Sequence, residues 1–166
     1  MRYGVVVRIK LMWWTKNVDP YLLQALIREE SALDPKAFSW AGALGLSQLM
    51  LPTAQDIART LKISRVTQDS LLDPDLNLRL GSWYLGMLLK RFEGNKAEAL
   101  AAYNAGAAVV KQWRALKSDL DLDAWIEEIP FAETRGYVKR VMRSYNTYKL
   151  LYGASDSIQA VSWSGS

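Results

Sequence analysis

Residues Val18–Leu33 predict an amphipathic helix that carries a carboxylate on its apolar stripe, and no other stretch constrains the fold as strongly. Asp19 is a suitable N-cap and Pro20 suits the first helical position, whereas Pro35 discourages further helix. At about 100° per residue, the apolar side chains share one face: Leu22, Leu23, Leu26, Ile27 and Leu33. Glu30 projects near the middle of that face, so the helix must bury a core surface with an acid in it.

The Glu30 carboxyl has two interpretations at this point. It is either an ordinary acid, solvated or held by an arginine or a backbone donor, or it lines a cleft. In a cleft, partial desolvation would raise its pKa and allow it to donate a proton near neutral pH. The helix alone leaves both interpretations open.

Composition limits the chemistry that the chain can perform. Its 166 residues suit a single domain, and it contains neither cysteine nor histidine. Thiolate and imidazole chemistry and the common zinc and iron sites are therefore excluded, and we expect no metal and no cofactor. Acid–base catalysis would fall to Glu, Asp, Tyr or Lys. The net charge of +4 is spread along the chain, so nucleic acid is not indicated as a partner.

The two ends of the chain differ from its middle. Residues 1–17 are apolar but interrupted by Arg8 and Lys10, which makes a poor signal peptide and no membrane span. We expect them to form an N-terminal extension, a first packing element or the cut end of a longer protein. Residues 153–166 lack helical periodicity and predict a loose tail that Trp163 could pin.

Between these ends, residues 18–152 predict one all-α domain of about six or more helices. Beyond the first, helical patterns with start and stop signals follow: 52–61, 73–92, 96–104, 107–116, 121–128 and 133–151. Residues 36–53 hold two glycines and no sustained period, and they predict a folded loop. Strand alternation is weak and confined to residues 3–9.

Helix packing does not explain the residues of four short stretches: 28–31 (Arg-Glu-Glu-Ser), 45–50 (Gly-Leu-Ser-Gln-Leu-Met), 102–106 (Ala-Tyr-Asn-Ala-Gly) and 128–138. Gln48 could bind a pair of sugar hydroxyls or cap a backbone group. Tyr103 could be a core tyrosine or the partner of a carboxylate. Glu133 opens a helix and is predicted to be structural, whereas Glu128 stays undecided. Each stretch alone is a weak signal.

Together, in this order and spacing, the four stretches resemble the catalytic domain of the soluble lytic transglycosylases, a lysozyme-like fold, over residues 18 to about 150. The resemblance implies that Glu30 is the catalytic acid and that Ser39 lies near the sugar that forms the anhydro ring. It further implies that substrate-binding groups line a saccharide groove: Gln48, Met50, Tyr103, Asn104, Glu128 and Tyr137. Tyr103 would orient the carboxyl, and Glu128 and Tyr137 would close the site. Ser47 departs from the family, where many members have Met, and would remove apolar surface from the groove.

The implied reaction needs one carboxyl. Protonated Glu30 would cleave the bond between N-acetylmuramic acid and N-acetylglucosamine, and the same carboxylate would then accept the C6 hydroxyl proton as a 1,6-anhydro ring closes without water. Asp34, beside Pro35, is predicted to be a turn or cap residue and not a second acid. The implied partner is peptidoglycan glycan strands, bound by a monomer in the periplasm or cell envelope, and Trp40 could stack on a sugar. A hydrolytic goose-type muramidase and an inactive peptidoglycan-binding module are the alternatives.

Overall fold

The computed structural model describes residues 18–162, with side chains as far as Gly153. Within this range the chain forms eight helices and two short strands. In chain order they are α2 (Pro20–Ser31), β1 (Ala43–Leu44), β2 (Leu49–Met50), α3 (Leu51–Thr60), α4 (Gln68–Leu71), α5 (Pro74–Arg91), α6 (Lys96–Ala105), α7 (Ala107–Leu116), α8 (Leu122–Glu127) and α9 (Ala132–Ser162). The predicted all-α fold is confirmed.

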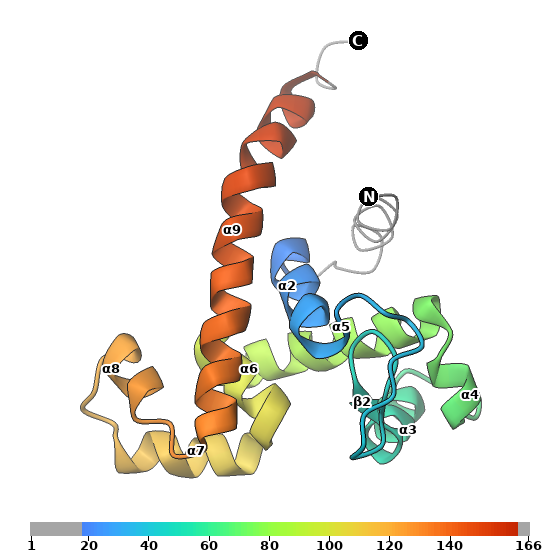
Figure 1. Ribbon diagram of the computed structural model, residues 1–166, viewed down its shortest axis with the longest axis horizontal. Helices are drawn as coiled ribbons and strands as arrows, with labels where there is room; N and C mark the ends of the chain where they lie inside the picture. Colours follow the sequence, from blue (N-terminus) through green and yellow to red (C-terminus); the bar gives the residue numbers. More distant parts are fainter. Residues whose placement is uncertain (1–17, 163–166) are drawn as a thin grey trace.

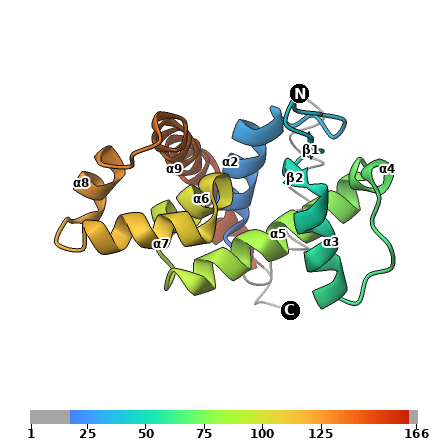
Figure 2. The same cartoon turned by 90° about the horizontal axis from the view of Figure 1, so that it is seen from below.

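Helix α5 runs between two groups of elements (Figures 1 and 2). On one side lie β1, β2, α3 and α4, which close a small hydrophobic cluster that includes Leu44, Leu49 and Ile57. On the other side α2, α6, α7, α8 and α9 enclose a larger cluster. Tyr84 and Tyr103 pack against both clusters, so the two parts share one interior.

Side-chain caps explain where most helices begin. The Asp19 carboxylate accepts a hydrogen bond from the Tyr21 amide (2.9 Å), as predicted, and Asp73 accepts one from the Leu76 amide (2.8 Å). Asn95 and Asp121 cap α6 and α8 in the same way. Because these signals are local, the predicted starts agree with the structure to within a residue or two.

The structure differs from the prediction at two places in the first half of the chain. The loop predicted over residues 36–53 contains an antiparallel pair in which Ala43 pairs with Met50 and Leu44 with Leu49. Strands of two residues are too short to show alternation in a sequence. Helix α4 was also missed, because its four residues lack a helical period. The weak strand pattern of residues 3–9 lies outside the described residues.

The last helix is longer than predicted. It continues through Gly153 to Ser162, so residues 153–162 are helical and the predicted loose tail is wrong for that stretch. Glycine ends a helix when it adopts a positive φ, and Gly153 does not. Inside a helix it instead costs only about 1 kcal/mol relative to alanine. Trp163 lies outside the described residues. No helix within the described range is both long and apolar enough to cross a membrane.

Candidate active site

Glu30 lies in the last turn of α2, where its side chain is half-buried. Its surroundings raise the pKa of the carboxyl from 4.5 to about 7, chiefly because burial disfavours the charged form. The Tyr137 hydroxyl and the Arg140 guanidinium lower this pKa, whereas the Glu133 carboxylate raises it. Of the two interpretations that the helix left open, this raised pKa favours the one in which Glu30 lines a cleft, and desolvation is its main cause.

Tyr137 is the buried neighbour of this carboxyl. Its side chain is only 4% exposed, and its hydroxyl acts on Glu30 as a hydrogen-bonding group. Among the described residues, however, that oxygen has no partner within standard hydrogen-bond geometry. The contact is therefore longer or more bent than a full hydrogen bond. Burial and the charge of Glu30 raise the pKa of Tyr137 well above 10, so the hydroxyl keeps its proton as a donor.

Tyr103 is placed differently from the role that the resemblance implies. Its hydroxyl donates to the backbone oxygen of Ser47 (2.9 Å), and its ring packs on Tyr84 with 5.1 Å between centroids. The charge of Glu30 contributes to a raised pKa of Tyr103, after burial, so the two groups are neighbours. Because its only hydroxyl proton is used on Ser47, Tyr103 supports the wall around Glu30, and the hydroxyl directed at the carboxyl is that of Tyr137.

The hairpin after α2 carries three of the predicted binding residues. The Ser39 amide and hydroxyl both bond to Ala43 (3.0 and 2.9 Å), and Ala43 pairs with Met50. Ser39, Ala43 and Met50 therefore lie in one row across the strands, and Met50 is 43% exposed. Trp40, at the tip, is almost fully exposed.

Gln48 supports the hairpin from within. Its Nε2 donates to the backbone oxygens of Ala37 (3.2 Å) and Gly45 (2.9 Å). Of the two roles that the sequence left open, the structure thus shows the backbone cap for the amide nitrogen. The Gln48 side chain is half-buried, and its backbone has a positive φ of 46°. Gln48 holds the hairpin in shape beside α2.

Ser47 does not line a groove, which corrects the expectation that it replaces apolar groove surface. It is fully buried, and its amide donates to Asn77 Oδ1 (2.7 Å). The Asn77 amide group also donates to the backbone oxygens of Leu44 and Leu71 (2.9 Å each). A Cβ atom on Gly81 would lie 2.1 Å from Ser47 Oγ, so α5 touches the hairpin at a glycine. Asn77 and Gly81 escaped prediction because their partners are distant in sequence.

Asn104 and Glu128 are not brought together with Glu30 by any described contact. The exposed Asn104 accepts a hydrogen bond from Thr134 Oγ1 (2.6 Å), which ties α6 to α9. The exposed Glu128 pairs with Lys117 (3.2 Å). It follows α8, which lies on the far side of α9 from α2 in both views (Figures 1 and 2).

Glu133 is the site residue that sequence reasoning set aside. It was predicted to serve the N-terminus of its helix, and α9 does begin at Ala132. Its charge nevertheless reaches Glu30. A signal was present, because Glu133 and Tyr137 are four residues apart and share one face of a helix. Helix α9, which carries both residues, packs on α2.

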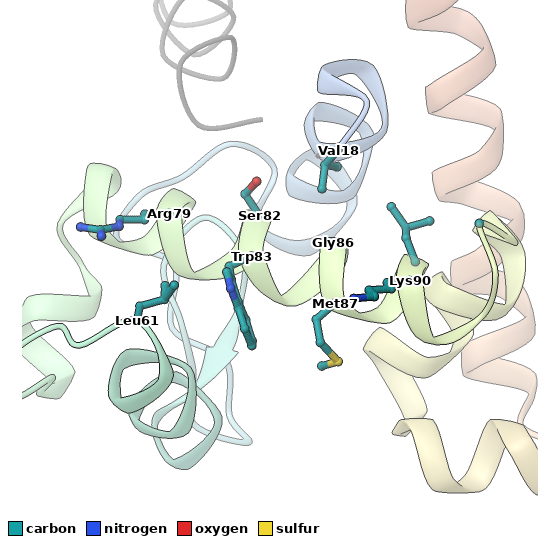
Figure 3. Close-up of a pocket in the computed structure, with 10 residues that line it drawn as sticks. Val18, Leu61, Arg79, Ser82, Trp83, Gly86, Met87 and Lys90 are labelled. Carbon is teal, nitrogen blue, oxygen red and sulfur yellow. The ribbon is translucent and has the colours of Figure 1, made fainter. Parts of the chain in front are cut away.

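The cavity drawn in Figure 3 lies elsewhere. It has a volume of about 740 Å³, and Arg79, Trp83, Met87 and Lys90 of α5 line it, together with Val18 and with Leu61, which follows α3. None of the predicted site residues lines it. We place the site at Glu30 because a half-buried acid with a pKa near 7 can perform chemistry, whereas this cavity offers surface cations and apolar side chains. The described residues hold no cluster of metal-ligating groups.

The geometry supports one kind of chemistry. A carboxyl with a pKa of about 7 is protonated in a large fraction of molecules at neutral pH, and it is basic enough to take a proton back. Two tyrosines and one arginine interact with it, and Glu133 is a carboxylate whose charge raises its pKa. Glu30 is therefore suited to general acid and then general base catalysis.

Comparison with known proteins gives a consistent result. A family model described as Transglycosylase SLT domain matches residues 9–126. The soluble lytic murein transglycosylase of Escherichia coli K12 is 36% identical over 151 residues, which cover 89% of this chain and 23% of that protein. A putative soluble lytic murein transglycosylase of Haemophilus influenzae is 38% identical over 136 residues, covering 81% of this chain and 23% of its own length.

Solved structures agree with the fold. An inactive mutant of lytic transglycosylase Slt from Pseudomonas aeruginosa, with glutamine in place of one glutamate, is 39% identical and has a TM-score of 0.81. It aligns over 89% of this chain and 24% of its own. The 70-kDa soluble lytic transglycosylase in complex with bulgecin A is 34% identical with a TM-score of 0.87, over 92% of this chain and 25% of that one. The chain thus spans about a quarter of these relatives.

Proposed function

Because the chain belongs to the Transglycosylase SLT family, we propose that it is a lytic transglycosylase that cleaves peptidoglycan glycan strands without water. The bond cut is the β-1,4 link between N-acetylmuramic acid and N-acetylglucosamine, and the product ends in a 1,6-anhydro ring. The observation that carries the proposal is the half-buried Glu30 carboxyl with a pKa of about 7. A relative that loses activity when one glutamate becomes glutamine supports an essential carboxyl.

In the first step Glu30 donates its proton to the glycosidic oxygen as the bond to the muramic C1 atom breaks. The acetamido oxygen of the same sugar stabilises the cationic carbon. Burial favours the protonated form of Glu30 before this step, and the Tyr137 hydroxyl and the Arg140 charge favour the ionised form after it.

In the second step the Glu30 carboxylate takes the proton of the C6 hydroxyl, and that oxygen bonds to C1. The ring closes, the acetamido oxygen is released, and Glu30 regains its proton, so no water is consumed. Ser39 and Met50, in one row of the hairpin, are the groups that we assign to the sugar on this side. Gln48 acts by keeping the hairpin in shape.

Hydrolysis is the second candidate, because Glu133 is a carboxylate within electrostatic reach of Glu30. Glycosidases that use water pair an acid with a second carboxylate about 5 Å or more away. In a hydrolase, Glu133→Gln would remove the base or nucleophile and abolish turnover. In the lytic reaction the same change removes one negative charge near Glu30, and it lowers the rate at neutral pH without abolishing it.

Mass spectrometry of digested peptidoglycan tests the proposal. We expect anhydro-muramic ends from the parent chain and from Glu133→Gln. We expect none from Glu30→Gln. Reducing ends from the parent would establish hydrolysis. Strand binding without any cleavage would make the chain a binding module. We propose action in the periplasm or cell envelope, where this polymer lies, and action as a monomer.

A further inference from the structure

A cluster of charges next to Glu30 joins the end of α2 to the middle of α9. Glu29 accepts a hydrogen bond from Ser144 Oγ (2.8 Å) and lies 3.5 Å from Arg140 Nε. Arg28 Nε lies 3.9 Å from Glu29 Oε1, the oxygen that accepts the hydrogen bond from Ser144. The Glu29 side chain is 18% exposed, whereas those of Arg28 and Arg140 are more than half exposed. Glu29 is thus the less exposed member of the cluster, and both arginines pair with it.

Arg140 is the cation that both neighbouring carboxyl groups share. It pairs with Glu29 and also lowers the pKa of Glu30. Its side chain runs back along α9 over Gly136, where a Cβ atom would lie 3.1 Å from Arg140 Nη1. The missing side chain at Gly136 therefore leaves room for the guanidinium on the side of the helix that carries Tyr137.

The proposed cycle needs a cation that is close but not too close. A guanidinium bound directly to Glu30 would keep the carboxyl ionised and make it a poor donor. Without any cation, the carboxylate left after proton donation would be destabilised by burial and by Glu133. Glu29 offers Arg140 a second partner, at 3.5 Å from its Nε.

We propose that Arg140 is a positioning residue for Glu30, and that Glu29, by holding the guanidinium, sets how much of its positive charge reaches the catalytic carboxyl. This inference rests on the proposed function. The other titratable groups that face Glu30 are Tyr137 and Glu133 from α9 and Tyr103 from α6. They stay unchanged in the variants below.

The test compares the parent chain with Arg140→Gln, Glu29→Gln and the double variant. The Glu30 carboxyl is titrated by carbon-13 NMR, and kcat/KM is measured on peptidoglycan against pH. Removal of Arg140 should move the alkaline limb of the kcat/KM profile, where the rate falls as Glu30 loses its proton, to higher pH. The expected shift is only about half a pH unit, since the charge of an exposed cation is partly screened by solvent. Removal of Glu29 frees Arg140 for Glu30 and should move the limb to lower pH.

The double variant separates this mechanism from a direct effect of the Glu29 charge. If Glu29 acts through Arg140, its removal has no further effect in the Arg140→Gln background. An equal downward shift in both backgrounds would overturn the proposal, as would shifts of the two single variants in one direction. Arg143→Gln, which removes an exposed charge from the same helix, is the matched control and should leave the limb in place.

The NMR titration keeps this inference separate from the proposed function. Opposite shifts of the Glu30 titration without any anhydro product would uphold the positioning role and reject the lytic activity. Anhydro products with an unmoved titration would do the reverse. Thermal unfolding identifies a variant that has lost its fold. If Arg140→Gln is such a variant, Arg140→Lys takes its place in the test; because it keeps the charge, its alkaline limb of kcat/KM should match that of the parent.

Discussion

The place of Glu30 on its helix decides the surroundings of its carboxyl. The side chain of Glu30, which follows Glu29 in the sequence, turns toward the buried face of α2, and burial raises the pKa of its carboxyl to about 7. Glu29 turns toward Ser144 and Arg140. One step of about 100° around the helix therefore separates an acid from the anchor of an arginine.

Glu30→Gln should abolish turnover and stabilise the fold at alkaline pH. The raised pKa means that the native state binds a proton more tightly than the unfolded chain, so stability is lost as pH rises from about 4.5 through about 7. The loss is at most about 3 kcal/mol, from 2.5 units at 1.36 kcal/mol each. Urea unfolding at pH 5 and pH 8 measures it. The parent should lose stability between these values, and Glu30→Gln should lose less; Asp34→Asn, at an exposed cap, should follow the parent.

Two tyrosine-to-phenylalanine variants should act on different properties. Tyr137→Phe removes the hydroxyl that lowers the pKa of Glu30, so the alkaline limb of kcat/KM should move to higher pH. Tyr103→Phe removes the donor to the Ser47 backbone oxygen and should destabilise the fold by about 1 to 3 kcal/mol. Rate profiles and urea unfolding of both variants check this. Equal effects of the two variants on the limb would contradict the separate roles.

Among the elements, local signals predicted most of what was found. Asp19 and Asp73 each act as a cap, and the bounds of α7 match the prediction at both ends. The hairpin could not be predicted in the same way, because its strands have two residues each and depend on α5 for support. The site was predictable in part, because Glu30 could be recognised as an acid on the apolar stripe of its helix. The roles of Glu133, Tyr137 and Arg140 could not be predicted, because they depend on the packing of α9 on α2, more than 100 residues away in the sequence.

Asn77 should be as important to the hairpin as a core residue. It is fully buried on α5 and satisfies one amide of Ser47 and the backbone oxygens of Leu44 and Leu71. Asn77→Ala leaves these groups without partners and should lower the free energy of unfolding by about 3 kcal/mol or more. Urea unfolding measures the loss. The exposed Asn146→Ala is the control, expected within about 0.5 kcal/mol of the parent.

The whole molecule has one interior with two parts, joined along α5 by Tyr84 and Tyr103. Helix α9 closes the larger part, and its buried side chains, among those described, lie between Thr134 and Tyr148. The final turns before Gly153 are mostly exposed. Among the described side chains of α9, those up to Tyr148 therefore do the packing.

Truncation should separate the two halves of α9. A chain that ends after Gly153 keeps every buried side chain of α9 that the structure describes, and it serves as the reference in urea unfolding. A chain that ends after Ser144 loses the hydrogen bonds from Tyr145 to Asp19 (2.8 Å) and between Arg28 and Tyr148 (3.3 Å), and two buried rings. It should be destabilised by about 4 kcal/mol or more. Equal stability of the two chains would show that α9 packs less tightly than described.

The order in which the chain is made gives the packing of α9 on α2 a further meaning. The family match ends at residue 126, and Glu133, Tyr137 and Arg140 all follow it. A nascent chain of that length already carries Glu30 and three of the four motifs, but it lacks the α9 residues that act on the carboxyl. The surroundings of Glu30 are therefore complete only after α9 has been made and has packed on α2.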